Sequence, residues 1–521
     1  MQFDYIIQGG TVIDGTGSRP PFQADVGIAG ARIAAIGNLD SAQANRVIDA
    51  HRRVVSPGFI DVHVHSEIAL LGGRDQMASV RQGVTTHLTA PDGFGWAPLP
   101  PEQAKQMWDY TRFAYGDADL SLDWPTVEAY LSIFPGRIPV NLYPQVPHCA
   151  VRLKAMGWDA RPATDEERKV MEGLVREWME AGAGVLCLGL DYQPSANADL
   201  RELVSLSKVA ASYGGLYAAH IRYQMLGRKR AWEETIEIAR QAEIPVHISH
   251  ERVDAEIADV LDRVELEGID LTFESYLYPA GMTHLAMMLP MEFQAGSLAE
   301  MLAQLERPQT REKSLPHLRE KLGHGDQIVG YTRSGRFIGM TLAEAAGREG
   351  KSCEEFAYDL AIEEEGIETL IFPWQTPPQE NEVTLDQTAV HPRMMIASDG
   401  IYNIPHPHPR SYGCFVQVLR RFVRERRLLS LQEAIYKMSG FPAQRFGLKD
   451  RGRMAEGLAA DVVVFDPATV ADGSTWQEPV QAAVGVEWVL VNGVPVIEKG
   501  NPTGELPGRV LRCSGTTTNL S

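Results

Sequence analysis

The hydrophobic pattern differs between the middle of the chain and its two ends. The first fifty residues alternate apolar and polar positions between Gly-rich turns, as in "FDYIIQGGTVIDG", and the tail does the same in "VEWVLVNGVPVIEKG". Residue-by-residue alternation bounded by turn residues is typical of short antiparallel strands. Both ends of the chain are therefore predicted to be rich in β-strands.

Between residues 59 and 438, short apolar runs alternate with amphipathic stretches. The stretches carry helix signals: in "TDEERKVMEGLVREWMEAG" Thr164 precedes Glu167 by three residues, which predicts a capping box, and "RELVSLSKVAASYGG" ends in glycines that stop a helix. The apolar runs have the length of buried strands. The eight predicted strands are "FIDVHVH", "TTHLTAP", "VNLYPQV", "VLCLGLD", "LYAAHIR", "VHISH", "LTFESYLY" and "RMMIASD".

Eight strands that alternate with helices predict an α/β fold, a (β/α)8 TIM barrel. A doubly wound open sheet is the alternative. Two connections are too long for plain loops: one of about 45 residues after the second strand, and one of more than a hundred between the seventh and eighth. Long connections that follow strands usually carry function.

The amino-acid composition limits the kinds of molecule that the protein is expected to bind. A chain of 521 residues with 44% hydrophobic and 22% charged residues is typical of a globular protein, and its net charge of −19 argues against binding to nucleic acid or an anionic membrane. No apolar run is long enough to span a bilayer, and "MQFDYIIQGGTVIDG" does not resemble a signal peptide. We therefore expect a cytoplasmic protein with a small-molecule substrate, and the sequence leaves the oligomeric state unknown.

Cysteine chemistry adds little. The five cysteines are odd in number, scattered and without C-x-x-C spacing, so neither a disulfide framework nor a thiolate zinc knuckle is supported.

Side chains that can bind a metal recur where the predicted strands end. The carboxyl ends of barrel strands meet at one face, so we expect these side chains to converge there. Four imidazoles and two carboxylates suit a borderline divalent ion, Zn²⁺ first, with Mn²⁺, Fe²⁺ or Co²⁺ as alternatives. The predicted ligands are His63 and His65 after the first strand, Asp92 after the second, His220 and His250 on the fifth and sixth, and Asp399 after the eighth.

Other histidines are expected to lie outside this set. His247 precedes His250 by three residues, which places it on the opposite strand face, packed against helices, and His87 is read in the same way. His406 and His408 lie in a Pro-rich loop beyond Asp399, where they could support the site from behind.

Motifs along nearly the whole chain resemble a known family. They are "SPGFIDVHVHSE", "RQGVTTHLTAPDGFGWAP", "GLDYQP", "YAAHIRYQ", "HISHERV", "SYLYPAGMT", "ASDG" and the stretch from "HPHPRSYGCF" to "AADVVVFDP". Together they resemble the N-acyl-D-amino-acid deacylases, or D-aminoacylases, of the metal-dependent amidohydrolase superfamily. The resemblance implies a barrel domain at residues 56–446, a small β-sandwich from residues 1–55 and 447–521, and an insertion after strand seven, at about 281–345, that covers the pocket.

The chain departs from the family after its second strand. The family usually reads close to "GNCGFS" there, with the cysteine as a metal ligand, whereas this chain has Asp92 in "APDGFG". Many amidohydrolases use a carboxylated lysine on strand four instead, but "VLCLGLD" contains no lysine. Asp92 is therefore the expected anionic ligand and could bridge two ions, with Cys187 and Asp191 as weaker alternatives. The number of ions, one or two, stays open.

The resemblance implies metal-dependent hydrolysis of a linear amide, an N-acyl-D-amino acid, to a carboxylate and a free D-amino acid. Asp399 would act first as general base toward water and then as acid toward the leaving amine. Two alternatives remain: the same chemistry on a dipeptide, a cyclic amide or a carbamate, and a catalytically silent binding subunit. A complete set of ligands disfavours the silent subunit.

Arginine and tyrosine are the expected anchors for the substrate's carboxylate. Arg222 and Arg252 each follow a ligand histidine by two residues, and a guanidinium can bind a carboxylate through two hydrogen bonds. The resemblance implies roles in carboxylate recognition for Tyr192, Arg252 and Tyr278, although the family commonly has lysine where Arg252 stands. The Met-rich "MTHLAMMLPMEF" and Trp96 form either an apolar acyl pocket or the core of the insertion.

Overall fold

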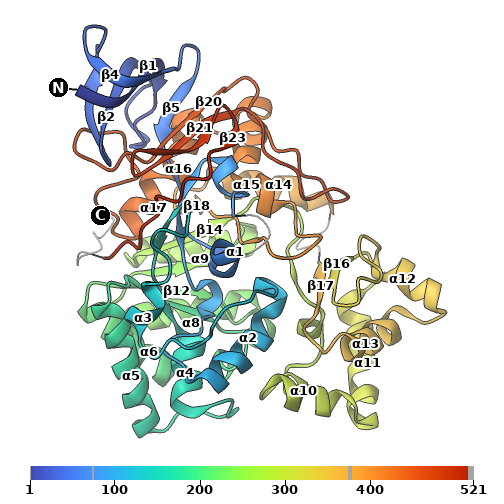
Figure 1. The fold of residues 1–521 in the computed structure, drawn as a ribbon. Helices are drawn as coiled ribbons and strands as arrows, with labels where there is room; N and C mark the ends of the chain where they lie inside the picture. The colour runs from blue at the N-terminus through green and yellow to red at the C-terminus, as the bar shows by residue number, and fades with distance from the viewer. Residues whose placement is uncertain (1, 73–75, 374–377, 514–521) are drawn as a thin grey trace.

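The computed structural model describes residues 2–72, 76–373 and 378–513. Figure 1 shows three parts: a sheet built from both chain ends at the top, a barrel of strands and helices below it, and an insertion that stands out to one side. The barrel and the insertion position the candidate site.

The barrel strands occur in the predicted order and pair in parallel. In the described residues two sheets, β6-β8-β9 and β10-β11-β12-β13-β14-β18, form the wall, with β10 spanning Val146–Pro147. The short strands β7 (Val64–His65) and β19 (Gly400–Ile401) pair in parallel and join the end of the first strand to the end of the last. This closure confirms the barrel and excludes the open sheet. The eight strands are β6 (Phe59–Asp61), β8 (Val84–Leu88), β9 (Asn141–Tyr143), β11 (Val185–Gly189), β12 (Leu216–His220), β13 (Val246–Ile248), β14 (Leu271–Ser275) and β18 (Met394–Ile396).

Helices follow the strands and cover the barrel. The predicted capping box is present: Thr164 and Glu167 bond each other's backbone at the start of α5, which buries Met171, Leu174, Val175 and Trp178 on one face. That spacing is why the segment is helical and packs inward. The helices outside the insertion are α1 (Glu67–Gly72), α2 (Pro101–Tyr115), α3 (Val127–Leu131), α4 (His148–Met156), α5 (Asp165–Glu180), α6 (Leu200–Ser212), α7 (Tyr223–Leu226), α8 (Arg228–Ala242), α9 (Ala255–Leu266), α14 (Pro378–Val390), α15 (Arg410–Gln417), α16 (Leu431–Met438) and α17 (Gly440–Arg445).

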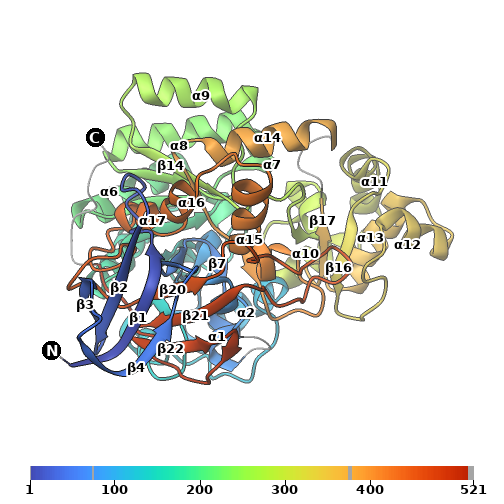
Figure 2. The same cartoon turned by 90° about the horizontal axis from the view of Figure 1, so that it is seen from above.

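Both chain ends contribute to one sheet, as the resemblance implied. Antiparallel pairing of β20 with β5 joins the C-terminal strands to the N-terminal ones (Figure 2), and apolar side chains such as Ile7, Val26 and Val464 form its core. The division at residues 55 and 447 stays a prediction. The nine strands are β1 (Gln2–Val12), β2 (Phe22–Ala29), β3 (Arg32–Gly37), β4 (Gln43–Asp49), β5 (Val54–Pro57), β20 (Val462–Phe465), β21 (Val486–Val491), β22 (Val494–Glu498) and β23 (Asn501–Pro502).

The last described residues leave this sheet and return to the barrel. The Leu142 N–H donates to Arg509 O at 2.8 Å, and the Leu511 N–H donates to Leu142 O at 2.6 Å, so the tail runs beside β9. This part of the predicted terminal unit therefore contacts the barrel instead.

The insertion between β14 and β18 is longer than predicted. Its three-stranded sheet pairs β15 (Thr283–His284) and β16 (Ile328–Thr332) with β17 (Thr369–Phe372), which lies beyond the expected end at about residue 345. An apolar run such as "TLIF" does not reveal from sequence which sheet it joins. The insertion helices are α10 (Leu298–Leu305), α11 (Pro308–Leu322), α12 (Leu342–Glu349) and α13 (Cys353–Glu363).

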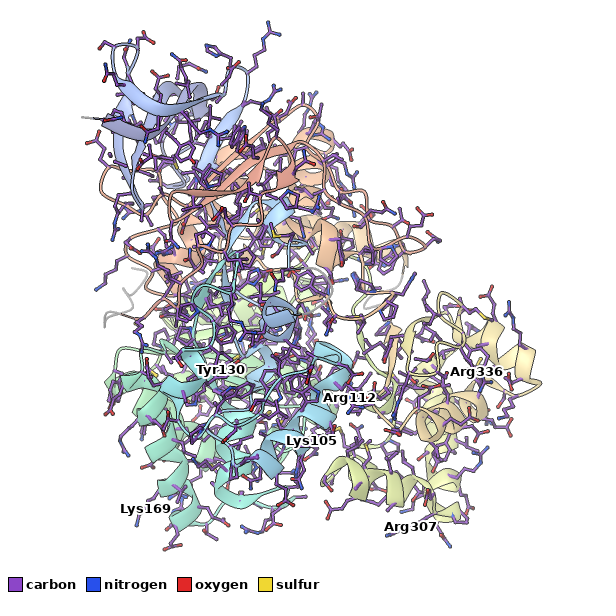
Figure 3. The ribbon with its side chains drawn as sticks, viewed as in Figure 1. Lys105, Arg112, Tyr130, Lys169, Arg307 and Arg336 are labelled. Carbon is purple, nitrogen blue, oxygen red and sulfur yellow. The ribbon has the colours of Figure 1, made fainter. Side chains whose placement is uncertain are left out.

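An ion pair links the insertion to the barrel. Arg112, which Figure 3 labels on the side of α2 that faces the insertion, places Nη1 3.3 Å from Oε1 of Glu368, one residue before β17. Glu368 is buried, and burial raises the pKa of its carboxyl to about 7 despite Arg112. None of the described helices is both long enough and apolar enough to cross a membrane.

Candidate metal centre and active site

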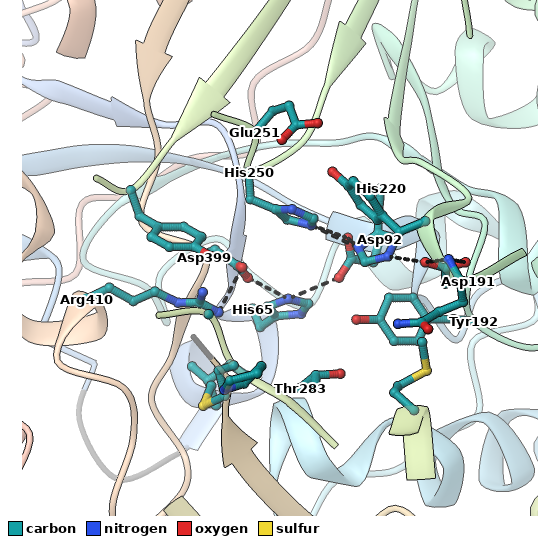
Figure 4. A pocket seen from close by; sticks show the side chains of 18 of the residues that line it. His65, Asp92, Asp191, Tyr192, His220, His250, Glu251, Thr283, Asp399 and Arg410 are labelled. Atoms are coloured by element: carbon teal, nitrogen blue, oxygen red, sulfur yellow. Dashed lines mark hydrogen bonds and ion pairs between the residues drawn. The ribbon is translucent and has the colours of Figure 1, made fainter. Parts of the chain in front are cut away.

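The histidines of the H-x-H motif lie where the first barrel strand ends. His63 precedes β7 and His65 ends it, and both side chains are buried. Their Nε2 atoms lie 3.6 and 3.4 Å from Oδ1 of Asp399, which follows β18. The same two nitrogens lie 3.5 and 3.6 Å from the carboxylate of Asp92, which follows β8. Two histidines and two carboxylates from three strands thus meet at one point, as Figure 4 shows for His65.

A second pair of histidines completes the cluster from the other side. Nδ1 of His220 and Nε2 of His250 are 2.9 Å apart, and they lie 3.8 and 3.9 Å from Oδ1 of Asp92. The Asp92 carboxylate therefore stands between the two histidine pairs, as Figure 4 shows for His65 on one side and for His220 and His250 on the other. This is the position of a bridging ligand. All six predicted metal ligands are brought together.

The donor atoms fit a divalent ion. Nε2 of His63 and Oδ1 of Asp92 are buried and have no hydrogen-bond partner among the described residues, although buried polar atoms normally have one. Two groups have ligand atoms within 4.8 Å of one another: His63 with Asp92 and His250, and His63 with His65 and Asp399. Imidazole nitrogens and carboxylate oxygens in this number suit Zn²⁺ and related ions.

The electrostatics of the cluster also favour a positive charge beside its two carboxylates. Burial alone would raise the pKa of the Asp92 carboxyl, but the imidazoles of His63, His250 and His220 hold that pKa below its usual range. Burial alone would lower the pKa of His63, but Asp92 and Asp399 raise it to about 10. A proton on His63 compensates the carboxylates here, and a divalent cation would supply the same compensation.

A cavity of about 290 Å³ opens over this cluster. His65, Asp92, His220, His250 and Asp399 line its floor (Figure 4), and the insertion contributes Met282, Thr283, Met287 and Met288 to its wall. The cavity thus combines a polar floor from the barrel with an apolar wall from the insertion.

Two residues of the site were missed by the sequence analysis. Oε1 of Glu274, on β14, accepts hydrogen bonds from His63 Nδ1 and from the His250 N–H, both at 3.0 Å, and so fixes the orientation of two predicted ligands. Nη2 of Arg410, at the start of α15, lies 2.8 Å from Oδ2 of Asp399, and its guanidinium lies 4.4 Å from the centre of the Tyr276 ring. In the sequence, Glu274 could have been recognised as a charged residue within the apolar run "LTFES". Arg410 could have been recognised only by its place in "HPHPRS", a segment of the family resemblance.

The predicted substrate anchors divide into two pairs. Tyr192 and Arg252 line the cavity, whereas Arg222 and Tyr278 do not. Arg222 bonds Glu234 and the carbonyls of Ala196 and Ala198, because β12 ends at His220 and the alternation of faces ends with it.

Tyr278 points away from the cavity. Its ring packs on His408 and Trp476, and only its backbone carbonyl reaches the site, where it accepts a hydrogen bond from Arg252. Tyr276 takes the place beside the cavity instead.

The expectation for His247 was wrong. It faces the barrel interior, where its nitrogens contact Thr272 and Glu274, although its ring also touches Phe446 after α17. His250 has a φ of 41°, so the strand alternation that would separate the two histidines ends before it. His87 is held by two serine hydroxyls, and His408 bonds the backbone of Ala280 and Arg410.

Neither alternative anionic ligand enters the cluster. Oδ2 of Asp191 lies 3.2 Å from His220 Nε2, the nitrogen on the far side of the ring from His250, and Asp191 also accepts the Gln224 N–H. Cys187 lies lower in the barrel, and burial raises the pKa of its thiol well above the ordinary value. Of Asp92, Asp191 and Cys187, Asp92 is therefore the best placed to be the anionic metal ligand.

Comparisons with known proteins agree with this geometry. The model of the amidohydrolase family matches residues 46–311 and 389–497. The chain belongs to the amidohydrolase family. It is 35% identical to the N-acyl-D-glutamate deacylase of Alcaligenes xylosoxydans xylosoxydans over 98% of this chain and 97% of that protein.

Two solved structures share the whole fold. One is the N-acyl-D-glutamate deacylase of Bordetella bronchiseptica, complexed with zinc and a phosphonate that mimics the tetrahedral intermediate, with 32% identity, a TM-score of 0.81 and coverage of 98% of this chain and 100% of that one. The other is a D-aminoacylase with a binuclear metal centre, with 32% identity, a TM-score of 0.81 and the same coverage. These relatives support a divalent metal in this amidohydrolase.

Replacement of Asp92 tests the bridging role in this amidohydrolase. We expect Asp92→Ala to lose one metal equivalent and most activity, because both histidine pairs lose their shared anion. Asp92→Cys should partly restore Zn²⁺-dependent turnover, because a thiolate is a soft ligand that favours Zn²⁺. Metal analysis and turnover are measured on the same samples, with Cys187→Ala as the control. Parental stoichiometry and turnover in Asp92→Ala would show that Asp92 only forms a turn.

Proposed function

We propose that this amidohydrolase is a metal-dependent N-acyl-D-amino-acid deacylase that holds its ion or ions at His63, His65, Asp92, His220, His250 and Asp399. The observation that carries the proposal is the convergence of these six side chains, five of which line the floor of one cavity, beside an arginine. The names of the full-length relatives support a linear N-acyl-D-amino acid as the substrate. Zn²⁺ is the expected ion, and the cytoplasmic location stays a prediction.

A divalent ion bound there would polarise the scissile carbonyl and make water a better nucleophile. Asp399 supplies the proton transfers. Arg410 holds its Oδ2, so Oδ1, which faces His63 and His65, is the oxygen that would take a proton from the attacking water. Burial would raise the pKa of Asp399, but Arg410 and His63 lower it below the usual range, so the carboxylate is ionised before reaction. It then delivers the proton to the leaving amine nitrogen.

Arg252 and Arg410 are placed to bind the substrate's carboxylate. Both line the cavity, and both have donors without a partner among the described residues: Nε of Arg252, and Nε and Nη1 of Arg410. Buried guanidinium donors bind a carboxylate strongly because little water competes with them. Tyr192 lines the same cavity.

The remaining wall favours an apolar substituent. Met282, Met287, Met288 and Phe113 line the cavity, and methionine adapts to ligands of different shape. Arg228 also lines it but is paired with Glu251 and Asp254. A second carboxylate on the substrate would therefore find no unpaired cation among the described lining residues beyond Arg252 and Arg410.

A hydrolysis screen tests the proposed function. We expect N-acetyl-D-methionine and N-acetyl-D-leucine to be hydrolysed faster than their L enantiomers, and faster than N-acetyl-D-glutamate by at least about tenfold in kcat/KM, since a second buried carboxylate would lack a partner. Chelation should abolish hydrolysis, and Zn²⁺, Mn²⁺ or Co²⁺ should restore it. Activity in metal-free protein, or no hydrolysis of any N-acyl-D-amino acid, would contradict the proposal.

Replacement of Asp399 tests the proton shuttle. Asp399→Asn keeps the size of the side chain and an oxygen for Arg410 but cannot accept the proton from water. We expect turnover to fall by at least about a hundredfold, the usual scale for a positioned acid–base group. Metal content and the melting temperature are measured alongside. Near-parental kcat would assign the proton transfers to another group.

Replacement of Arg252 tests the carboxylate anchor. Arg252→Ala should weaken binding of substrates with a free α-carboxylate by roughly a few kcal/mol, because the pair is removed from water. The matching carboxamide should be affected far less, and Arg252→Lys should retain part of the binding. KM and kcat are measured for both substrates. Equal losses on the acid and the amide would show that Arg252 does not bind the carboxylate.

A further inference from the structure

We propose that Glu67 is a positioning residue for Asp92: it holds the loop after β8 so that the Asp92 carboxylate stands between the two histidine pairs. The inference rests on the proposed metal-dependent function. It concerns the last residue of the motif "SPGFIDVHVHSE", to which the sequence analysis gave no role and which does not line the cavity.

The bonds of Glu67 join the two segments that carry metal ligands. Its Oε1 accepts the Ala90 N–H at 2.5 Å, and its Oε2 accepts the Ser66 N–H at 3.2 Å. Ser66 follows the ligand His65, and Ala90 precedes Asp92 by two residues. One carboxylate therefore ties the end of β7 to the loop that follows β8.

Burial of the Glu67 carboxylate at this place costs free energy. Glu67 is 1% exposed, and no arginine, lysine or histidine among the described residues forms an ion pair with it. A buried carboxylate without a cation is disfavoured unless hydrogen bonds stabilise it. The two hydrogen bonds described above come from backbone N–H groups, and the Tyr115 side chain adds a smaller stabilisation, so the carboxylate mainly secures the path of the backbone.

The loop that Glu67 holds has an unusual conformation. Ala90 and Asp92 have φ values of 56° and 55°, in the left-handed region that residues with a Cβ rarely adopt. Such a conformation persists only where the surroundings enforce it. It turns the Asp92 side chain toward the histidines.

The other side of the loop rests on β11. A Cβ on Gly93 would lie 2.7 Å from the carbonyl oxygen of Cys187, and a Cβ on Gly189 would lie 2.4 Å from the carbonyl oxygen of Asp92. Both positions therefore require glycine, and they let the loop pack directly on the strand. The loop after β8 is therefore held between β11 and Glu67. Among the described hydrogen bonds, the one from the Ala90 N–H to Glu67 is the only one that reaches this loop from the side of α1.

Removal of the carboxylate would leave the Ala90 N–H buried without a partner, which favours a different path for the loop. Asp92 would then move relative to both histidine pairs, while Glu274 still holds the His63 ring and the His250 backbone and Asp191 still contacts His220. The predicted consequence is weaker binding of one ion in a protein that remains folded.

The test compares metal binding in variants of the full chain. Glu67→Leu should weaken the binding of one Zn²⁺ equivalent by about 10- to 100-fold, the range for residues that orient a ligand. Glu67→Gln keeps an oxygen for the Ala90 N–H and should stay within about threefold of the parent. Affinity is measured by competition with a chromophoric chelator, and the absorption spectrum of the Co²⁺ form reports the ligand geometry.

Two further variants separate positioning from stability. Ile68→Ala removes a buried side chain from the next position of α1 without touching the hydrogen bond, so it should lower the melting temperature and leave metal affinity unchanged. Glu67→Asp keeps the charge but shortens the reach, so it should weaken the binding of one ion even if Glu67→Leu fails to fold.

Parental affinity and a parental Co²⁺ spectrum in Glu67→Leu, or in Glu67→Asp if the leucine variant does not fold, would overturn the inference. Equal loss of affinity in Ile68→Ala would also overturn it, because stability alone would then explain the effect. A parent protein that binds no divalent ion would instead refute the proposed function.

Discussion

The burial of two carboxylates among four imidazoles is the constraint on which the site depends. Asp92 and Asp399 lie at the mouth of the barrel with little access to water, and Arg410 is the one arginine or lysine that pairs with either of them in the part of the chain that the structure describes. Charges removed from water must be compensated or neutralised. The histidines provide this compensation by holding protons or by sharing a cation with the carboxylates. Because these six side chains come from five different strand ends, the compensation holds only while the barrel is closed.

Barrel closure is accordingly built into the site itself. The Asp399 N–H donates to the carbonyl of His63 at 2.8 Å, and β7 pairs with β19 directly after these two residues. Glu274 ties His63 to the backbone of His250 across the barrel mouth. The same hydrogen bonds that join the first strand to the last also fix the distances between ligands. Formation of the barrel therefore also places the side chains of the proposed metal centre relative to one another.

The sequence was sufficient to predict the strands and the convergence of six side chains that can bind a metal, because both follow from local rules. Strand runs are marked by apolar stretches, and in a barrel the residues at their carboxyl ends must converge. Prediction failed where the backbone leaves the regular strand. Arg222 lies beyond the end of β12, so counting by two from His220 gave the wrong direction for it. His250 lies beyond the end of β13, so counting back from it gave the wrong face for His247. Glu274 was missed because His63, which it bonds, is 211 residues away in sequence, and Arg410 was missed because the loop between it and Asp399 has no regular pattern that would show the direction of its side chain.

The barrel supplies the polar side chains proposed to carry the reaction, and the insertion supplies the apolar side chains expected to select the substrate. The polar floor comes from strand ends that must keep their geometry for the ligands to meet, whereas the methionines of the opposite wall belong to a segment with its own sheet and helices. Changes in that wall need not disturb the metal ligands, because they act through shape and polarity alone. This explains how relatives at 32 to 35% identity can share the fold and yet be named for D-glutamate, D-aspartate or D-amino acids in general. We therefore expect the insertion wall to hold side chains that distinguish this amidohydrolase from its relatives, in addition to the two barrel positions that depart from the family resemblance, Asp92 and Arg252.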